Sequence, residues 1–495
     1  MTNAEMTGRV ATTLAERILS ALSPSPDRPF LLGPGTTLTR RDFLARVAAR
    51  QRQLREQGIG PGSRLLVLAG DDSGFWADLV AVWGLGAVAA PASGSLEARR
   101  LDPLIELVEP QAVIGARPAV MPANLAWLPE PSPGTPSTPI AERNPDGLAA
   151  ILFTSGSTGL AKAVETNDAA LLTNVEATLE RVGLDERDVL FIAIPFNFFS
   201  AILHFLAAAL RGAAFHADPR RLVGADLYVA LEQSQATCFG GAPGQLRWIA
   251  DCAAERPLQL RWVLSSGDHL PVDVIRRLRT NLPKTDILTV YGMTELGGRF
   301  CILDPALVDA QMGSVGTPIR GLGYRILDDA GRPAPAGTEG EVCAFGETVM
   351  RGYRRNADAT SRTLTADGLR TGDLGYIDAQ GLLRLTGRAD DVFKCQGQKV
   401  STVLIAQALM ETGLFADVAV LGWDDPHLGT VPRVFYVLAG AGRLDQASLL
   451  RGLKATLPEL HVPRLFTAVE RVPRTGSGKV LRGELRELAK TVVPA

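Results

Sequence analysis

A short loop between residues 154 and 162 carries the residue types that bind phosphate in proteins. An apolar run, Leu148–Phe153, precedes it, and the loop itself consists of Thr154, Ser155, Gly156, Ser157, Thr158 and Gly159. Glycines let backbone N–H groups approach an anion closely, and the hydroxyl groups add further donors. Lys162 follows and supplies a compensating positive charge. The pattern therefore predicts a phosphate-binding loop.

The same residues allow two other interpretations of this loop. A Walker A loop requires a glycine directly before the lysine and Ser or Thr directly after it. Those two places hold Ala161 and Ala163, which excludes a Walker A loop. A Ser/Gly-rich turn between a strand and a helix remains the plain structural alternative. The rest of the chain decides between this turn and a phosphate site.

Four later stretches carry further groups suited to nucleotide chemistry. They are Tyr291–Glu295 (YGMTE), Leu369–Gly375 (LRTGDLG), Thr386–Val400 and Pro473–Val480 (PRTGSGKV). With the phosphate loop, and in this order, they resemble the motifs of the adenylate-forming (ANL) superfamily. That superfamily includes acyl- and aryl-CoA synthetases, adenylation domains of peptide synthetases, and luciferase. The resemblance covers nearly the whole chain, from about residue 30 to residue 482.

The YGMTE stretch supplies candidate groups for adenine, phosphate and metal. The resemblance implies that Tyr291, Gly292 and Met293 lie against the nucleotide, with the flat Tyr291 ring available for adenine to stack on. Thr294 would offer its hydroxyl to the α-phosphate, and Glu295 a hard oxygen ligand to Mg²⁺. We therefore expect Thr294 and Glu295 to be catalytic, with Glu295 as the metal ligand.

The next two stretches supply candidates for the ribose and for a hinge. By the resemblance, Asp373 accepts hydrogen bonds from the two ribose hydroxyls, a task suited to a carboxylate, and Arg388 also meets the ribose. Asp390 would absorb the backbone rotation between two orientations of a small domain. Lys399, in the hairpin that follows, is a further expected cofactor-binding residue.

The last stretch contains the expected catalytic lysine, Lys479. The resemblance implies that this lysine meets the carboxylate of the acid and the α-phosphate during adenylation. There, a mobile cation offsets the charge that builds on the pentavalent phosphorus. A Gly-rich basic loop near a C-terminus is also typical of a flexible tail. The apolar flank Leu465–Val472 favours a loop that docks.

The resemblance also indicates an acyl pocket, formed by Phe196, Asn197, Phe198, Phe199, Gly241 and Gly297. This mostly apolar set favours an apolar, aromatic or medium-length acid, although Phe198 stands where many acyl-CoA synthetases have histidine. Gly267 and Asp268 are assigned to an adenine-side loop, in which Asp268 and His269 replace the usual small residue and proline and could simply solvate the turn. His204 is interpreted as a helix histidine with a core neighbour rather than a catalytic base.

The elements that must position these groups alternate between strand and helix. Arg64–Ala69 and Ala87–Ala90 have the continuous apolar character of buried strands, and Phe75–Trp83 between them is predicted as a helix. This alternation predicts a parallel sheet covered by helices on both faces. Gly84–Ala89 resembles a dinucleotide fingerprint, but it follows a helix and opens a strand, the reverse of that motif, and is interpreted as a turn.

Composition excludes several classes of function. The 495 residues are 46% hydrophobic and 21% charged, as in ordinary globular enzymes, and the net charge of −2 gives no electrostatic footprint for nucleic acid. Five scattered cysteines without a CxxC pair predict reduced thiols rather than disulfides or a zinc site. No apolar run approaches the roughly 20 residues that a bilayer span needs. We therefore expect a cytoplasmic protein with no membrane partner.

The predicted fold is α/β and has two domains. A large N-terminal domain of stacked sheets and helices is expected over residues 1–388. A small, mobile C-terminal α+β domain is expected over residues 389–495, with the hinge at Asp390. This is the organisation that the adenylate-forming resemblance implies.

The function that the resemblance implies is ATP-dependent ligation of a carboxylic acid to a thiol. An acyl-adenylate would form with release of pyrophosphate, and coenzyme A would then accept the acyl group. The expected cofactors are ATP, Mg²⁺ and coenzyme A. Two alternatives stay open: transfer to the phosphopantetheine of an acyl or peptidyl carrier protein or to another nucleophile, and a nucleotide-binding regulator without catalysis. Ala161, Ala163, Phe198 and Thr402 favour the regulator, whereas the intact Glu295, Asp373 and Lys479 count against it.

Overall fold

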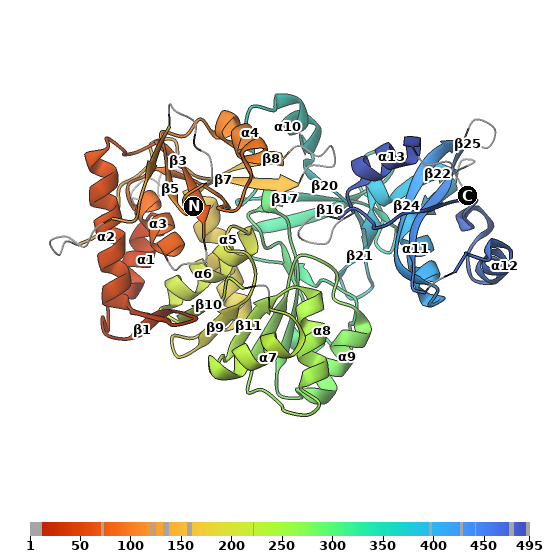
Figure 1. The fold of residues 1–495 in the computed structure, drawn as a ribbon, viewed down its shortest axis with the longest axis horizontal. Helices are drawn as coiled ribbons and strands as arrows, with labels where there is room; N and C mark the ends of the chain where they lie inside the picture. The colour runs from red at the N-terminus through yellow and green to blue at the C-terminus, as the bar shows by residue number, and fades with distance from the viewer. Residues whose placement is uncertain are drawn as a thin grey trace. The chain divides into compact units, whose positions relative to one another are not determined.

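The computed structural model describes most of the chain. The described residues are 12–70, 74–118, 121, 125–131, 138–155, 161–220, 222–395, 398–425, 429–440, 442–474 and 480–491. They form two compact units, each described below by itself (Figure 1). The first unit takes its residues from Met1–Thr154, Lys162–Tyr324 and Ala344–Leu369. The second takes them from Ser155–Ala161, Arg325–Cys343 and Arg370–Ala495.

The largest sheet of the first unit has nine strands and places most of the candidate site at its strand ends. Its order is β15 (Thr317–Pro318), β14 (Cys301–Ile302), β13 (Asp286–Tyr291), β12 (Trp262–Ser265), β11 (Cys238–Gly241), β9 (Val189–Ile192), β10 (Ala214–Ala217), β1 (Pro29–Gly33) and β2 (Thr36–Thr39). The central strands, from β13 to β1, pair in parallel, while both edges are antiparallel. The parallel sheet expected from residues 64–90 is the second sheet, in which Arg64–Ala69 and Val88–Ser93 pair in parallel.

A second, seven-stranded sheet carries the predicted phosphate loop. Its order is β18 (Gly352–Tyr353), β8 (Ala161–Asn167), β7 (Leu148–Ser155), β4 (Val88–Ser93), β3 (Arg64–Ala69), β5 (Ala112–Gly115) and β6 (Ala126–Leu128). The segment after the loop is a strand, β8, rather than a helix. Residues 84–87 turn from a helix into β4, with Gly86 at φ +62°, which agrees with the interpretation of this segment as a turn.

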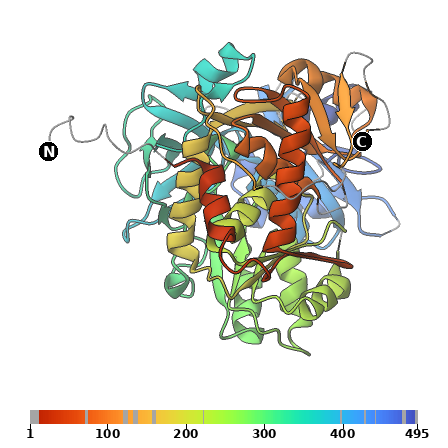
Figure 2. The same ribbon diagram turned by 90° about the vertical axis from the view of Figure 1, so that its left-hand side faces the viewer.

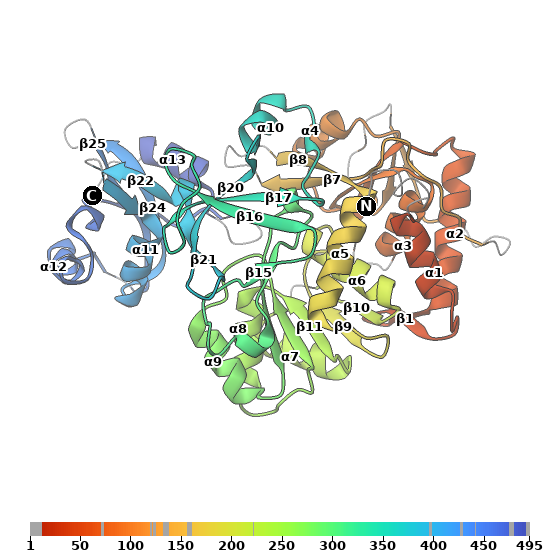
Figure 3. The same cartoon turned by 180° about the vertical axis from the view of Figure 1, so that it is seen from behind.

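Helices pack against both sheets of the first unit. They are α1 (Leu14–Leu22), α2 (Arg40–Glu56), α3 (Gly74–Gly84), α4 (Ala98–Val108), α5 (Asp168–Val182), α6 (Phe199–Arg211), α7 (Gly224–Gln233), α8 (Pro243–Cys252), α9 (Val272–Asn281) and α10 (Ala357–Thr363). Figure 2 looks onto the N-terminal helices in red, and Figure 3 shows α1, α5 and α6 beside one another. None of the described helices is long and apolar enough to cross a membrane.

Local sequence explains why these helices begin where they do. Thr13 caps α1, because its hydroxyl accepts a hydrogen bond from the Glu16 N–H while the Glu16 carboxylate accepts one from the Thr13 N–H. Thr39 and Asp42 form the same reciprocal cap at α2. Each such cap satisfies two backbone donors that the first helical turn leaves without partners.

An aromatic cluster joins the helices of the first unit to its large sheet. Trp76 of α3 stacks on Phe205 of α6 at a ring separation of 4.9 Å and meets Phe215 of β10 edge-on at 5.1 Å. Phe30 and Phe43 extend the cluster, with ring centroids 4.9 Å apart. Because rings of this size bury large apolar areas, the cluster fixes α6, and with it the segment that leads into α6.

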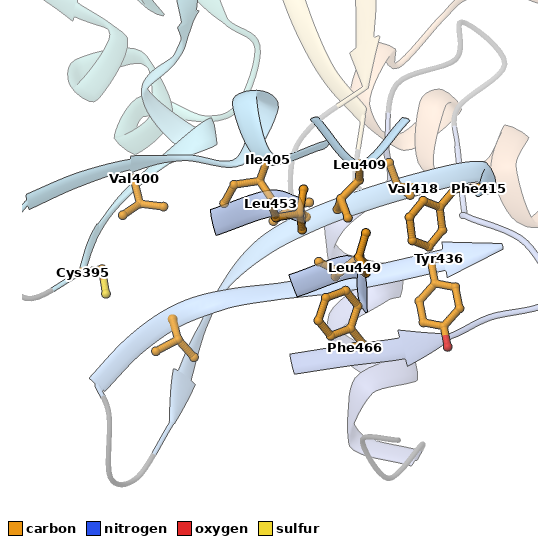
Figure 4. Packing of buried hydrophobic residues seen from close by; sticks show 13 residues of the cluster. Cys395, Val400, Ile405, Leu409, Phe415, Val418, Tyr436, Leu449, Leu453 and Phe466 are labelled. Atoms are coloured by element: carbon orange, nitrogen blue, oxygen red, sulfur yellow. The ribbon is translucent and has the colours of Figure 1, made fainter. Parts of the chain in front are cut away.

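The second unit contains β strands, a hairpin and three helices around a separate core. A further sheet has the order β16 (Leu322–Leu327), β17 (Gly340–Gly346), β20 (Gly368–Ile377) and β19 (Leu364–Thr365), with β21 (Leu383–Arg388) beside β20; β19 belongs to the first unit and β21 to the second. The remaining elements are β22 (Val392–Cys395), β23 (Gln398–Ser401), α11 (Thr402–Glu411), β24 (Phe415–Asp425), β25 (Gly429–Leu438), α12 (Gln446–Thr456), β26 (Leu465–Ala468) and α13 (Arg482–Thr491). Phe415, Tyr436 and Phe466 pack with Ile405 and Leu409 of α11 (Figure 4).

Candidate active site

The YGMTE stretch forms a tight turn at the end of β13. Met293 is extended, Thr294–Leu296 make one 3₁₀ turn, and Gly297 follows at φ +77°. The Met293 carbonyl accepts hydrogen bonds from the N–H groups of both Leu296 and Gly298, each at 3.0 Å. These bonds fix the backbone on either side of Glu295, so the direction of its carboxylate is set by the turn.

Residues distant in sequence clamp this turn from outside. Asn174 of α5 donates from Nδ2 to the Arg299 carbonyl at 2.7 Å and to the Leu296 carbonyl at 3.3 Å. Thr348 donates from Oγ1 to the same Leu296 carbonyl at 2.7 Å. The Met350 N–H bonds the Glu295 carbonyl at 2.9 Å. Asn174 and Thr348 are both fully buried, so the clamp is shielded from water.

The side chain of Glu295 is joined to the lysine of the phosphate loop through Tyr353. The Tyr353 hydroxyl donates to Glu295 Oε1 at 2.9 Å, and Glu295 is only 8% exposed. The Lys162 ammonium lies over the Tyr353 ring, 4.7 Å from its centroid. Glu295 and Lys162, which were both predicted from the sequence, are therefore linked through Tyr353. Tyr353 itself was not predicted.

The chemistry of Glu295 fits the expected Mg²⁺ ion. Among the described residues no arginine or lysine forms an ion pair with this carboxylate, so that part of the chain does not neutralise its charge. Mg²⁺ is commonly held by one or two carboxylates together with substrate phosphates and waters. No cluster of three or more potential metal ligands occurs among the described residues.

Tyr291 and the adenine-side residues occupy the ends of β13 and β12. The Tyr291 ring is buried against Phe300, with the centroids 5.5 Å apart. Gly267 has φ +97°, and the Asp268 carboxylate accepts from the His269 N–H at 2.7 Å, so Asp268 is engaged in shaping its own turn. A cavity of about 20 Å³ beside this loop is lined in part by the loop residues. The roles of Gly267, Asp268, Tyr291, Gly292 and Met293 toward a nucleotide stay predictions.

The residues expected at the acyl pocket lie in three places: at the start of α6, at the end of β11, and at the end of the 3₁₀ turn that follows β13. Phe196 is buried against Trp76 and Phe75, which gives it a packing contact in the aromatic cluster. Phe198 is the N-cap residue of α6, Phe199 begins the helix, and both are half-buried, as is Asn197. Gly241 ends β11 and Gly297 ends the 3₁₀ turn. Their contact with an acid stays a prediction.

Gly298 brings the turn and α6 together. A Cβ atom added there would lie 2.2 Å from Leu203 Cδ1 and 3.0 Å from Phe199 Cε1, and the residue has φ +104°. Only glycine accommodates both the backbone conformation and the approach of α6. The turn that carries Glu295 is therefore in direct contact with the helix that begins at Phe199.

His204 is buried in α6, as the sequence interpretation expected. Its Nδ1 lies 2.6 Å from the Ser200 carbonyl oxygen. Burial, aided by the Arg299 charge, lowers the pKa of His204 to about 3. A ring with this pKa is neutral at physiological pH and too weak a base for proton abstraction.

In the second unit, the two predicted ribose residues face each other across adjacent strands. Asp373 of β20 pairs in register with Arg388 of β21, and Arg388 Nη1 donates to Asp373 Oδ1 at 2.8 Å. The Asp373 N–H also bonds Thr371 Oγ1 at 3.0 Å. The Arg388 side chain is 47% exposed. The structure brings this predicted pair together, while their binding of ribose stays a prediction.

The predicted hinge residue lies in a short 3₁₀ turn, Ala389–Asp391, directly after β21. Asp391 forms an ion pair with Arg482 of α13, and the Asp391 carbonyl accepts from Thr402 Oγ1 at 2.8 Å. Thr402 is one of the positions that departs from the family pattern, and here its hydroxyl ties α11 to the turn. Lys399 lies opposite Lys394 in the β22–β23 hairpin.

Several predicted residues lie outside the part of the chain that the structure describes. They are Gly156, Ser157, Thr158, Gly159 and Lys479. Thr154 and Ser155, which end β7, are within it. At the base of the loop that contains Lys479, Arg474 pairs with Val480 across a β-bridge, and Arg474 also forms an ion pair with Asp417 at 2.6 Å.

Solved structures share this fold. An o-succinylbenzoate CoA synthetase from Bacillus subtilis, solved with its acyl-adenylate intermediate, matches with a TM-score of 0.85, covering 95% of this chain and 97% of that chain at 21% identity. An anthranilate CoA ligase bound to anthranoyl-AMP matches with a TM-score of 0.84, covering 99% of both chains at 20% identity. The predicted α/β fold, with a large N-terminal and a small C-terminal domain, is confirmed.

Sequence comparison defines the family. Residues 20–354 match the family model of AMP-binding enzymes, and residues 404–479 match that of the AMP-binding enzyme C-terminal domain. The chain therefore belongs to the AMP-binding enzyme family. A feruloyl-CoA synthase from Amycolatopsis sp is 29% identical over 480 residues, 93% of this chain and 96% of the relative. A sulfoacetate–CoA ligase from Cupriavidus necator is 27% identical over 508 residues, 98% of this chain and 99% of the relative.

This membership makes the protein an AMP-forming, adenylate-forming enzyme of the acyl- and aryl-CoA ligase type. The prediction of a ligase-like enzyme from this superfamily is confirmed. Sequence reasoning missed Asn174, Thr348 and Tyr353, because no local pattern marks a residue that acts on a turn far away in the chain. It also missed Arg299, although a charged residue inside the apolar stretch LGGRFCIL is a signal that could have been followed.

Proposed function

We propose that the protein is an acid–thiol ligase that activates a carboxylic acid with Mg·ATP and transfers the acyl group to coenzyme A. A carboxylate oxygen of the acid would attack the α-phosphorus, and the bond from that phosphorus to the bridging oxygen would break as pyrophosphate leaves. The thiol sulfur would then attack the acyl carbon, AMP would leave, and the thiol proton would pass to solvent. The arrangement of Glu295, Tyr353 and Lys162 is the observation that carries this proposal.

That arrangement suits phosphoryl chemistry for a physical reason. Glu295 presents a buried carboxylate without an ion-pair partner among the described residues, and Lys162 presents a cation over the face of the Tyr353 ring. The negative phosphates of a bound triphosphate would be complemented by Lys162, and its positive metal ion by Glu295. Held in a shielded site, such fixed charges stabilise charge development at phosphorus without reorganising at the moment of reaction. Mg²⁺ would neutralise phosphate charge there.

The remaining roles are assigned as the sequence motifs suggest. Thr294 would contact the α-phosphate, Tyr291 the adenine, and Asp373 with Arg388 the ribose. Residues 154–159 would cradle phosphate, and Lys479 would meet the reacting carboxylate. The hydrogen-bonded pairing of Asp373 with Arg388 supports a shared role, because it holds the carboxylate in one orientation.

Coenzyme A is the acceptor that the relatives favour. The feruloyl-CoA synthase and the sulfoacetate–CoA ligase both align over more than nine tenths of this chain, and both names specify a CoA thioester as product. A carrier-protein phosphopantetheine is the second candidate acceptor. It is favoured by one alignment, to a probable peptide synthetase from Salinispora arenicola, which is 29% identical over 96% of this chain and 6% of that protein.

Pyrophosphate release with Mg·ATP tests this proposal across a panel of aryl, short, medium and long acids, with and without coenzyme A. We expect acid-dependent release that coenzyme A accelerates, with AMP and an acyl-CoA as products. The matched variants are Glu295→Gln, expected to lose at least about 100-fold in rate, and Glu347→Gln, an exposed carboxylate expected to change nothing. Release that ignores coenzyme A but responds to a phosphopantetheinylated carrier would favour the second acceptor. Silence from every acid would contradict the proposal.

A further inference from the structure

Arg299 is a buried cation directly after the turn that carries Glu295. Arg299 is 4% exposed. The Asn174 side chain holds the Arg299 backbone at both ends, because it donates to the Arg299 carbonyl and accepts from the Arg299 N–H. Burial lowers the pKa of Arg299 to about 10, which leaves the guanidinium charged at neutral pH. The chain therefore holds a full positive charge inside the first unit.

No described carboxylate neutralises this charge. The Arg299 Nε atom has no hydrogen-bond partner among the described residues. Its Nη2 atom lies 3.3 Å from Nε2 and 3.4 Å from Nδ1 of His204, at nearly equal distances from both ring nitrogens. His204 Nδ1 faces the Ser200 carbonyl at 2.6 Å, so that nitrogen carries the proton. Among the described residues, the His204 ring is the side chain that lies within hydrogen-bond distance of the Arg299 guanidinium. This ring is neutral, so it cannot balance the positive charge.

Two other buried arginines of this unit, Arg50 and Arg40, have acid or carbonyl partners for their guanidinium groups. Arg50 forms an ion pair with the buried Asp78, with 2.6 Å between Nε and Oδ1. Arg40 donates from its two terminal nitrogens to two backbone carbonyls, at 2.5 Å and 2.6 Å. Among the described residues, Arg299 has neither an acid nor a carbonyl of this kind. An unbalanced buried charge costs several kcal/mol, so a methionine or leucine would serve better if packing were the only requirement.

The guanidinium lines a small cavity with apolar walls. The cavity has a volume of about 20 Å³ and is lined by residues that include Leu203, His204, Leu264 and Arg299. Leu203 of α6 also lies against the Gly298 position, together with Phe199. The cavity therefore adjoins the residues expected at the acyl pocket, and its one charged wall is Arg299. A space of this volume holds about one water molecule, so it would receive only the charged end of a ligand, whose apolar part would lie among the residues expected at the acyl pocket.

We propose that Arg299 determines specificity by binding a second anionic group of the acid, so that the enzyme prefers acids with two acidic groups over matched monoacids. The first carboxylate would be activated near Glu295, and the second, a carboxylate or sulfonate, would lie against the guanidinium. This inference rests on the proposed function and narrows its substrate class. It also narrows the expectation of an apolar, aromatic or medium-length acid to acids that carry a second anionic group at the far end.

Matched pairs of acids test this inference in the full-length enzyme. Acid-dependent exchange between pyrophosphate and ATP is measured for glutarate against valerate, adipate against hexanoate, and isophthalate against benzoate. The wild-type enzyme is expected to show at least about tenfold higher kcat/KM for the diacid of its best pair, chiefly through KM. In Arg299→Met this preference should vanish or reverse, while Arg299→Lys should keep part of it. Arg181→Met, which removes an exposed arginine bonded to the Ile302 carbonyl, is the matched control.

Each outcome bears on the inference. A wild-type enzyme that uses the monoacids as well as the diacids would overturn it, whether or not the Arg299 variants fold, and would leave the proposed function intact. A diacid preference that survives unchanged in a folded Arg299→Met enzyme would overturn it as well. Absence of exchange with any acid of either series would instead contradict the proposed function, and with it this inference.

Discussion

Two regions of the molecule hold candidate catalytic groups in different ways. The turn from Tyr291 to Arg299 is buried and is clamped by Asn174 and Thr348, which lie 122 and 52 residues from their shared partner Leu296. The β20–β21 hairpin holds Asp373 against Arg388 through its own register, only 15 residues apart, and leaves the arginine half exposed. The first region is fixed by the folded core and the second by local pairing.

This difference separates two kinds of mutational effect. In the buried turn a side chain cannot change without disturbing the packing that positions Glu295, so stability and rate should fall together. In the hairpin, water replaces lost contacts and the strands keep their register, so nucleotide affinity should fall while stability stays nearly constant. The predictions below test this division, from the largest expected effect to the smallest.

Gly298→Ala should give the largest loss of stability. The new methyl group would lie 2.2 Å from Leu203 Cδ1, at a residue whose φ is +104°. We expect a loss of about 3 kcal/mol in the free energy of unfolding, measured by urea denaturation, from overpacking together with backbone strain. Gly331→Ala is the matched control, because its φ is +75° and no atom lies within 4 Å of the added Cβ, so only about 1 kcal/mol should be lost. Equal losses would show that α6 does not press on the turn.

Acid should destabilise the buried region through His204. Burial and the nearby Arg299 charge lower the pKa of His204 to about 3, whereas the unfolded chain has the ordinary value near 6.5. Between these values the unfolded state binds more protons, so stability is fully present above about pH 6.5 and is lost as pH falls. From pH 7.5 to pH 5 the histidine should account for a loss of about 2 kcal/mol.

The measurement for this prediction compares His204→Gln with the wild-type enzyme in urea denaturation at several pH values. The variant should lack the part of the pH dependence that the ring causes, so its loss between pH 7.5 and pH 5 should be smaller by about 2 kcal/mol. Parallel pH profiles for the two enzymes would mean that the ring is not held neutral.

Tyr353→Phe should weaken the metal site without removing it. The change deletes the hydroxyl that donates to Glu295 Oε1 and keeps the ring beneath Lys162. We expect the Mg²⁺ concentration for half-maximal pyrophosphate exchange to rise by about tenfold, because a hydrogen bond to a charged group contributes about 1.5 kcal/mol or more. Tyr353→Leu, which also removes the ring, should add a rise in the KM for ATP. An unchanged Mg²⁺ dependence in Tyr353→Phe would remove Tyr353 from the site.

Arg388→Lys should give the smallest effect of the series. Lysine keeps the charge beside Asp373 but loses the planar fork that orients the carboxylate. We expect the KM for ATP to rise about fivefold, while the melting temperature changes by less than about 2 °C because the side chain is half exposed. A large fall in the melting temperature would break the distinction between the two regions.

The sequence predicts the second region better than the first. The motif that holds Asp373 and Arg388 is read within a short stretch, and strand register then brings the two residues together. The YGMTE motif identifies Glu295 and Tyr291, yet the contacts that fix them come from Asn174, Thr348 and Tyr353. Long-range contacts of this kind depend on how the sheets and helices pack, and packing has no local periodic signal.

The same limit applies to the acid pocket. The apolar residues around Phe199 predict a mostly apolar pocket, and we propose that Arg299 adds a charged group at its far end. The prediction of an apolar, aromatic or medium-length acid rests on residue types, whereas the burial of Arg299 without a described acid partner is a property of the folded chain.

The central claim is that the acid attacks the α-phosphorus of ATP, and oxygen transfer tests it most directly. The enzyme is incubated with Mg·ATP, coenzyme A and an acid labelled with ¹⁸O in its carboxylate, and the products are analysed by mass spectrometry. We predict one ¹⁸O atom in AMP and none in pyrophosphate, because the carboxylate oxygen that attacks phosphorus stays with AMP when the acyl group leaves. Label in inorganic phosphate, with ADP as the nucleotide product, would contradict adenylation and the roles assigned to Glu295 and Lys162.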